Sequence, residues 1–183
     1  MGRMKFAFKK TSISGLVVVK PEVGSDERGT FSENYKASEF RKAGIKTLFV
    51  QENRSVSRKN VLRGLHYQRP PHAQAKLVRC GHGRIFEVAV DLRPRSKTFG
   101  KHYSLELSAA NGLMLYIPEG FAHGFYALTD KAEVMYKCSR EYAPSHDAGV
   151  RWNDPALKIK WPCKRPVLSP KDKALPFLAE RGK

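Results

Sequence analysis

The sequence predicts an all-β fold in which antiparallel strands form a sandwich or barrel, accompanied by a few short helices. Most of the chain divides into short segments rich in β-branched and aromatic residues, and Gly, Pro, Asn or Asp turns bound most of them. Their spacing is typical of antiparallel sandwiches and barrels. A helical pattern is confined to one stretch of the first half and to the tail, so strands dominate the expected fold.

The first part of the chain is expected to form three strands and one helix. Each strand segment carries β-branched or aromatic residues, and the three are GLVVVKP (15–21), TFSENY (30–35) and KTLFVQE (46–52). Before the third strand, KASEFRKAG (36–44) resembles a helix. Phe40 lies on one face of that helix, and Gly44 provides a C-terminal stop.

The rest of the chain is expected to be an almost continuous series of strands. The first two are joined by a Pro-Pro turn, and the series is VLRGLHYQ (61–68), AKLVRC (75–80), RIFEVAVDL (84–92), HYSLELS (102–108), GLMLYIP (112–118), AHGFYAL (122–128) and AEVMYKCS (132–139). A short C-terminal tail begins at about Ser169 and has room for a second short helix. Because we find neither an internal repeat nor a linker, we expect one domain over residues 1–183.

Composition is typical of a soluble globular protein. The chain has 183 residues, of which 41% are hydrophobic and 28% charged. No apolar run approaches the roughly 18 residues that cross a bilayer, and no signal peptide opens the chain. Its 3 cysteines are far apart and form no CxxC pair, which favours neither a disulfide framework nor a zinc knuckle. We therefore expect a cytoplasmic protein with no membrane partner.

The net charge of +17 is the one unusual bulk property. Such a field attracts anions, whether nucleic acid, lipid headgroups or a phosphorylated small molecule. However, the basic residues are spread along the whole chain, without a block of like charge or a basic-aromatic repeat. We therefore expect no nucleic-acid partner, and interpret most of the charge as a solvated surface.

Strand alternation predicts that several ionisable side chains point into the sandwich. Lys76 shares a strand face with Val78, and Tyr136 shares one with Val134, because side chains of a strand alternate between its two faces. His66 lies with the apolar Leu62. Polar groups that point inward among apolar neighbours are typical of a ligand pocket.

Arg63 lies one strand position out of phase with that inward face. It would point away from the pocket unless a bulge at Gly64 re-aims it.

The segment GLMLYIPEGFAHGF (112–125) fits the pattern G-x5-P-x-G-x2-H and resembles the second motif of cupins, which are small jelly-roll barrels. Cupins that bind metal also have an upstream His-x-His and a Glu. Here the first motif continues as His66-Tyr67-Gln68, and Lys76 stands where that pattern has Glu. An ammonium group repels a metal cation, so we predict no metal site and a fixed organic cation instead.

Longer blocks resemble the dTDP-4-dehydrorhamnose 3,5-epimerase family over most of the chain, from about residue 15 to residue 172. The blocks are DERGTFSENY, FVQENRSVSRKNVLRGLHYQ, PPHAQAKLVRC, IFEVAVDLRPRSKTFG, LYIPEGFAHGFYAL, EVMYKCSREYAPSHDAGVRWNDP and LSPKD. The resemblance implies a cupin-type jelly roll. It also implies conversion of dTDP-4-dehydro-6-deoxy-D-glucose to dTDP-4-dehydro-L-rhamnose, a step of dTDP-L-rhamnose synthesis.

Such a reaction needs a base, an acid on the opposite face and a group that holds the enolate oxygen. The resemblance implies His66 as the base, Asp172 as the carboxylate that orients it, Lys76 as the enolate-stabilising cation and Tyr136 as the opposing acid. Taken singly, each has a plain structural alternative: a core histidine, an exposed turn aspartate, an outward lysine and a core tyrosine. No cofactor is expected, because the substrate ketone is already the electron sink.

The resemblance also implies a set of substrate-binding residues: Arg28, Glu33, Gln51, Asn53, Arg63 and, in a supporting role at the pocket wall, His123. Arginine suits a diphosphate because its planar fork donates two parallel hydrogen bonds. In the family the DERG region reaches into the site of the partner subunit, so a homodimer is implied.

Three alternatives stay open at this point. A relative that inverts only C3 or only C5 of another dTDP-deoxysugar can keep the same His and Lys. A non-catalytic sugar- or nucleic-acid-binding barrel is the alternative from another class, and it has no need of an acid–base set. A metal cupin is the third, disfavoured by Lys76.

Overall fold

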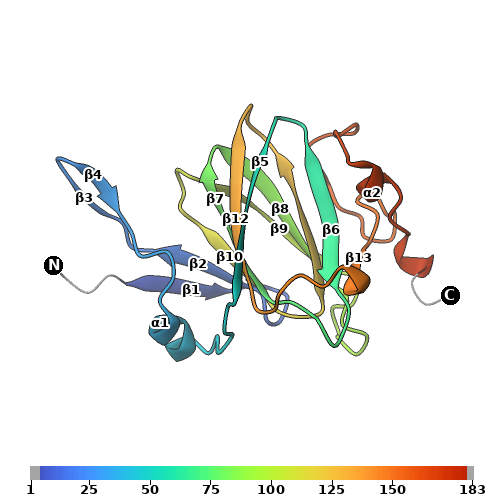
Figure 1. The fold of residues 1–183 in the computed structure, drawn as a ribbon, viewed down its shortest axis with the longest axis horizontal. Helices are drawn as coiled ribbons and strands as arrows, with labels where there is room; N and C mark the ends of the chain where they lie inside the picture. The colour runs from blue at the N-terminus through green and yellow to red at the C-terminus, as the bar shows by residue number, and fades with distance from the viewer. Residues whose placement is uncertain (1–4, 181–183) are drawn as a thin grey trace.

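Two antiparallel sheets face each other and enclose the main core in the computed structural model, which describes residues 5–180 (Figure 1). The first four and last three residues of the expected 1–183 domain lie outside the described part. One sheet has six strands, in the order β1 (Phe6–Lys10), β2 (Val17–Pro21), β10 (Met114–Ile117), β7 (Lys76–His82), β12 (Ala132–Cys138) and β5 (Gln51–Ser57). The other has five, in the order β13 (Asp147–Gly149), β6 (Leu62–Gln68), β11 (Phe121–Ala127), β8 (Arg84–Asp91) and β9 (His102–Ser108). The predicted all-β class is confirmed.

The core between the sheets follows from strand alternation. Val78 and Val134 of the six-stranded sheet and Ile85, Ala89 and Phe125 of the five-stranded sheet belong to one buried cluster. Burying side chains of this size stabilises the fold by roughly 1.5–3 kcal/mol each. Polar residues on these same strand faces are therefore held in fixed positions by the apolar packing around them.

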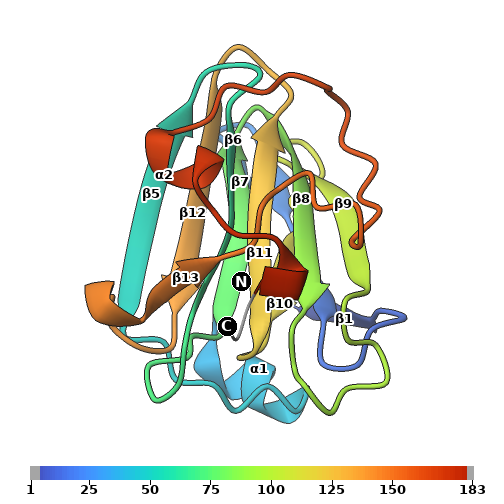
Figure 2. The ribbon, with the colours of Figure 1, turned by 90° about the vertical axis from the view of Figure 1, so that its right-hand side faces the viewer.

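Each sheet also has a covered outer face. Helix α1 (Ala37–Lys42) buries Phe40 against the six-stranded sheet, where Phe40 packs edge-on to Phe6, Phe8 and Tyr35. The C-terminal segment crosses the outer face of the five-stranded sheet and carries α2 (Pro170–Lys173) beside β6 (Figure 2). Single 3₁₀ turns lie before β13, at η1 (Pro144–His146), and after α2, at η2 (Leu178–Glu180).

A small hairpin projects from the body of the molecule. It consists of β3 (Gly24–Asp26) and β4 (Gly29–Phe31), and Figure 1 shows it extending away from β6 and α2. Both strands are exposed along their whole length. Within the described chain, the hairpin forms a separate two-stranded sheet and pairs with neither of the two larger sheets.

Some strand bounds differ from those that the sequence predicts. The strand predicted at 46–52 is wrong in position, because β5 covers Gln51–Ser57 and residues 46–50 are irregular, with Leu48 72% exposed. Cross-strand pairing explains the shift: β5 is polar, yet it pairs residue by residue with β12, from Gln51 opposite Cys138 to Ser57 opposite Ala132. The strand predicted at 30–35 ends early, at Phe31.

Candidate active site

A pocket of about 340 Å³ opens between the two sheets at the end nearest α2. It is lined by Gln51, Asn53, His66, Tyr67, Gln68, Gln74, Lys76, Tyr136, Tyr142, Asp147 and Lys171. The structure thus brings together five of the residues that the sequence analysis singled out. His66 comes from the five-stranded sheet, whereas Lys76 and Tyr136 come from the six-stranded sheet opposite it.

His66 is paired with Asp172. The Nε2 atom of His66 lies 2.5 Å from Oδ1 of Asp172, and the two side chains are 30% and 4% exposed. Ser169 caps the short helix α2 by accepting a hydrogen bond from the Asp172 backbone N–H, which places the carboxylate at the pocket. Burial alone would raise the pKa of Asp172, but hydrogen bonds from His66, Ser169 and the Gly64 backbone lower it, so the carboxylate stays ionised.

Lys76 and Tyr136 form the opposite wall of the pocket. The Nζ atom of Lys76 lies 5.8 Å from the centre of the Tyr136 ring, and Lys76 is only 8% exposed. Burial lowers the pKa of the Lys76 ammonium and raises the pKa of the Tyr136 phenol. Burial therefore favours the neutral form of both groups: the Tyr136 phenol keeps its proton, and the Lys76 ammonium is stabilised by a negative charge placed beside it.

A bulge in β6 positions Arg63. Opposite β11, His66 pairs with His123 but Arg63 pairs with Phe125, so β6 has one extra residue at Gly64. Gly64 has φ +124°, and a Cβ there would meet the Cα of Gly124 at 2.7 Å, so only glycine fits. Arg63 donates from Nε to the hydroxyl of Ser57 at 3.0 Å, and its charge partly offsets the effect of burial on Tyr136.

His123 lies deeper, beside the pocket rather than on its lining surface. Its Nδ1 atom lies 2.8 Å from Oε1 of Glu87, and its ring centre lies 6.2 Å from that of Tyr136. Burial raises the pKa of Glu87 well above its ordinary range and lowers the pKa of His123 well below. The sequence analysis did not single out Glu87. The signal was present, because Glu87 shares the inward face of β8 with Ile85 and Ala89.

Arg28 and Glu33 lie outside this pocket. The Arg28 side chain is 84% exposed near the tip of the β3–β4 hairpin, where it pairs with Asp26 at 2.6 Å. Glu33 pairs with Lys36 at 3.3 Å. Neither contacts the other predicted binding residues within the described chain.

Other lining residues were missed by the sequence analysis. Tyr142 donates its hydroxyl to Asp147 at 2.8 Å, and Lys171 forms an ion pair with the same carboxylate. Lys171 directly precedes Asp172, so the LSPKD block held a signal for it. Tyr142 lies in an irregular connection, and Asp147 begins the three-residue strand β13, so alternation predicts the side-chain direction of neither.

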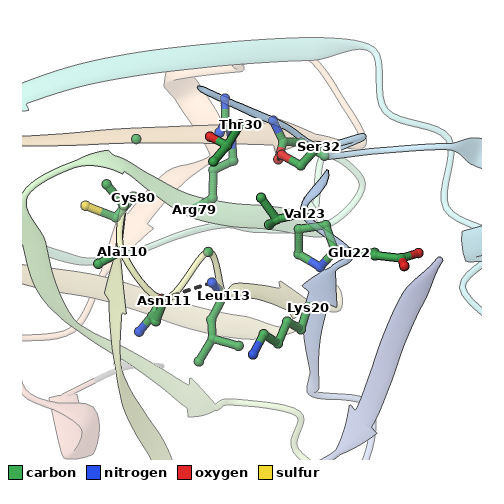
Figure 3. Close-up of a pocket in the computed structure, with 15 residues that line it drawn as sticks. Lys20, Glu22, Val23, Thr30, Ser32, Arg79, Cys80, Ala110, Asn111 and Leu113 are labelled. Atoms are coloured by element: carbon green, nitrogen blue, oxygen red, sulfur yellow. Dashed lines mark hydrogen bonds between the residues drawn. The ribbon is translucent and has the colours of Figure 1, made fainter. Parts of the chain in front are cut away.

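A larger hollow, of about 830 Å³, lies elsewhere, between the hairpin and the edge of the six-stranded sheet (Figure 3). Figure 3 shows Thr30 and Ser32 on one side of it and Asn111 and Leu113 on the other. Its lining residues include neither a histidine nor an aspartate, and Glu22 is the one carboxylate among them. The smaller pocket is therefore the better candidate for a site of acid–base catalysis.

Two features are absent from residues 5–180: a helix that could span a membrane and a cluster of metal ligands. In this range no helix has the length and apolar character that a membrane crossing needs. Nor does this range contain three His, Cys, Asp or Glu side chains grouped so that they could hold a metal ion.

Comparison with known proteins gives a consistent result. A sequence model of the family described as dTDP-4-dehydrorhamnose 3,5-epimerase matches residues 10–180. The dTDP-4-dehydrorhamnose 3,5-epimerase of Salmonella typhimurium is 50% identical over 171 residues, which cover 92% of this chain and 93% of the relative. The crystal structure of the Elizabethkingia anophelis enzyme of that name superimposes with a TM-score of 0.93 at 44% identity, covering 97% of this chain and 99% of its own.

A second solved structure carries a ligand. The dTDP-6-deoxy-D-glucose-3,5-epimerase of Legionella pneumophila, in complex with dTDP-4-keto-L-rhamnose, has a TM-score of 0.93 at 42% identity and covers 97% of this chain and 95% of its own. The predicted cupin-type jelly roll is confirmed by these superpositions. With the family model spanning nearly the whole chain and relatives at this level of identity, the chain belongs to the dTDP-4-dehydrorhamnose 3,5-epimerase family.

Proposed function

We propose that this chain is a dTDP-4-dehydrorhamnose 3,5-epimerase that converts dTDP-4-dehydro-6-deoxy-D-glucose to dTDP-4-dehydro-L-rhamnose. Family membership supports the reaction. The observation that carries the mechanism is the placement of a His66–Asp172 pair on one sheet wall and Lys76 with Tyr136 on the other, around one pocket. An inversion needs proton removal on one face of the sugar and delivery on the other, which two facing walls provide.

His66 acts as the base in this proposal. A neutral imidazole can take the acidic proton next to the C4 ketone, first from one neighbouring carbon and then from the other. The ionised Asp172 holds the ring in place and stabilises the imidazolium as it forms.

Lys76 and Tyr136 complete the reaction. As the proton leaves carbon, negative charge develops on the C4 oxygen, and the buried Lys76 ammonium supplies its counter-charge. Tyr136 then delivers a proton from its phenol to the opposite face of the enolate carbon. Solvent returns a proton to the phenolate and takes one from the His66 imidazolium, so both groups are ready for the second carbon. The ketone carries the electron pair throughout, so the proposed reaction uses neither a metal nor a redox cofactor.

The substrate anchors fall into two groups. Gln51, Asn53 and Arg63 belong to this pocket or its edge, and the Arg63 guanidinium suits the diphosphate. Arg28 and Glu33 do not line the pocket of their own chain and pair with Asp26 and Lys36 instead. We therefore propose a homodimer in which the hairpin and the segment directly after it supply these two residues to the partner's site.

Exposed apolar side chains support the dimer. Val23 and Phe31, at the two ends of the hairpin, are 52% and 55% exposed, and Val56 on the edge strand β5 is 44% exposed. A second copy of the chain would cover such surface.

A complementation experiment tests the dimer. Arg28→Ala and His66→Ala chains are expected to be nearly inactive alone. Co-expressed, they form mixed dimers in which one of two sites is intact, so about a quarter of the wild-type activity returns. Recovery of no activity from purified mixed dimers would contradict the shared site.

Isotope exchange tests the reaction. The protein is incubated with dTDP-4-dehydro-6-deoxy-D-glucose in deuterated water, and proton NMR follows C3 and C5. Exchange at both carbons, lost in His66→Ala while dTDP still binds, is the expected result. Exchange at one carbon would identify a mono-epimerase of another dTDP-deoxysugar, and exchange at neither would leave a non-catalytic binding protein.

We further propose that the enzyme works in the cytoplasm, where a nucleotide-sugar substrate would be available, and that residues 1–183 act as one domain. Its partners would be the dTDP-sugar and a second copy of the chain, rather than nucleic acid or a membrane. The net charge of +17 makes nucleic acid the partner to test. Binding to mixed-sequence DNA that is tight and steeply salt-dependent would contradict the proposal that nucleic acid is not a partner.

A further inference from the structure

Glu87 is a fully buried carboxyl group behind the pocket with a single hydrogen-bond partner. Its side chain is 0% exposed, and Oε1 lies 2.8 Å from Nδ1 of His123. The other oxygen, Oε2, is buried without a partner among the residues that the structure describes. None of the roles in the proposed reaction uses this residue, and an unsatisfied buried oxygen in a native interior calls for an explanation.

We propose that Glu87 is a positioning residue: held as a neutral carboxylic acid, it donates its proton in a hydrogen bond to Nδ1 of His123 and so fixes the tautomer that presents Nε2–H toward the pocket. The value of that tautomer for catalysis rests on the proposed epimerase function. The hydrogen bond and the tautomer themselves do not.

The surroundings of Glu87 favour the acid form. An ionised carboxylate has two oxygens that both require donors, but only Oε1 has one here. Its neighbours on the same inward faces are Ala89 and Phe125, which offer no donor. The charge of Lys76 favours ionisation, but burial outweighs it and raises the pKa of Glu87. A neutral acid that donates from Oε1 leaves only the carbonyl oxygen Oε2 unpaired, which costs far less than an unpaired charge.

The tautomer of His123 follows from that proton. When Nδ1 accepts from Glu87, the ring stays neutral and carries its own proton on Nε2. Burial, together with the nearby charges of Lys76 and His66, keeps the pKa of His123 well below its ordinary range. The His123 side chain retains 10% exposure, and Nε2 is not among the buried atoms that lack a partner. Because Nδ1 faces Glu87, Nε2 is the ring nitrogen that this contact leaves free.

A donor at this position would serve the proposed reaction. His123 packs edge-on against the Tyr136 ring, over which Lys76 also lies. An Nε2–H here and the Lys76 ammonium are two donors beside one wall, and both favour an oxygen that gains negative charge. The opposite tautomer would present a lone pair to that oxygen and repel it.

Nitrogen NMR tests the tautomer without any substrate. In protein labelled with ¹⁵N-histidine at pH 7, long-range proton–nitrogen correlations report which ring nitrogen carries the proton, and loss of signals in His123→Gln assigns them. A protonated Nε2 with an unprotonated Nδ1 is expected. A protonated Nδ1 would overturn the proposal, whether or not the chain proves to be an epimerase.

Paired variants test the consequence for catalysis. Glu87→Leu removes the donor, and kcat is expected to fall about tenfold or more, with mixed His123 tautomers and unchanged dTDP affinity. Glu87→Gln is expected to recover most of that loss, because its amide N–H can also donate to Nδ1. Equal losses in both variants would contradict the positioning role.

Infrared spectroscopy covers the case in which Glu87→Leu does not fold. The folded wild type is expected to show the carbonyl stretch of a buried carboxylic acid, which Glu87→Gln lacks. Absence of that band from the wild type would mean that Glu87 is ionised, and would overturn the proposal.

Discussion

Two histidine–carboxylate pairs share one end of this sandwich, but their surroundings differ. Asp172 receives hydrogen bonds from His66 and from the Gly64 backbone, and Ser169 caps its helix, so its carboxylate stays ionised at the pocket. Within residues 5–180, His123 is the only hydrogen-bond partner of Glu87, at 2.8 Å, and apolar side chains surround this carboxyl group. The same two types of residue therefore support a charged pair at the pocket and, in our proposal, a neutral donor pair in the interior. The number of donors around the carboxylate decides between these forms.

The largest effect is expected from Asp172→Asn. The amide keeps the size of the side chain but loses the charge that stabilises protonated His66, so kcat should fall by about 10² to 10⁴-fold. Steady-state kinetics measures this, with dTDP affinity as the control for folding. The matched change in the interior pair, Glu87→Gln, should cost less than about tenfold. Equal losses at the two positions would remove the distinction between the pairs.

Lys76→Met is expected to lower activity while it raises stability. Lys76 is a buried cation whose charge acts on both members of the interior pair. Loss of the cation should lower kcat by about 10² to 10³-fold. The same change removes a buried charge, so the melting temperature should rise by about 2–4 °C, equivalent to about 1 kcal/mol. The exposed Lys10→Met is the control and should change neither quantity. A stable variant with normal kcat would show that Lys76 does not hold the enolate.

Tyr136→Phe should separate proton removal from proton delivery. His66 can still remove the proton and return deuterium to the same face, so exchange should stay within about tenfold of the wild type. Net epimerisation should fall by about 10²-fold, because the opposite face has lost its acid. Proton NMR in deuterated water measures both rates in one sample. Parallel loss of exchange and inversion would place Tyr136 outside the delivery step.

The smallest effect concerns the pH dependence of stability. As pH rises, the contribution of Glu87 to the free energy of unfolding falls, whereas that of His123 grows. The pKa of Glu87 is raised above its ordinary 4.5, so its contribution is fully present below that pH and is lost as pH rises through the raised pKa. The pKa of His123 is lowered below its ordinary 6.5, so its contribution is present above 6.5 and is lost as pH falls. In the wild type the two offset each other between these values.

Glu87→Gln should leave the pH dependence of stability that comes from His123 alone. Below pH 6.5 the free energy of unfolding of the variant, relative to the wild type, should decline by up to about 1.4 kcal/mol per pH unit. Urea unfolding at several pH values between 5 and 7 measures the difference. Parallel curves for the two proteins would mean that Glu87 and His123 do not titrate as described.

Sequence patterns predicted the fold best where apolar alternation is strong. The stretches around β7, β8 and β12 place mostly apolar residues on one strand face, and the inward-facing Val78, Ile85 and Val134 belong to the core between the sheets. β5 was displaced because Gln51–Ser57 has little apolar character and is held by β12. The three-residue strand β13 is too short to show a period at all.

The site was predictable only where the strand period applies. Alternation placed His66, Lys76 and Tyr136 on inward faces, and Gly64 indicated the bulge that positions Arg63. Tyr142 and Asp147 lie in or next to a connection, where no period relates one side chain to the next. Residues from a second chain, such as those proposed for the hairpin, cannot be placed by any local pattern.

The position of Asp172 has a consequence for how the enzyme is made. His66 and Asp172 are 106 residues apart, and Asp172 belongs to α2, which follows the last strand of the described chain. During translation, therefore, the ribosome releases the strands of both sheets before it releases the group that orients the base. A nascent chain, or one cut by a protease before Ser169, can pair its strands but lacks Asp172. In our proposal, catalytic competence is acquired only after Asp172 has been synthesised, so chains that end before it would not process the nucleotide sugar.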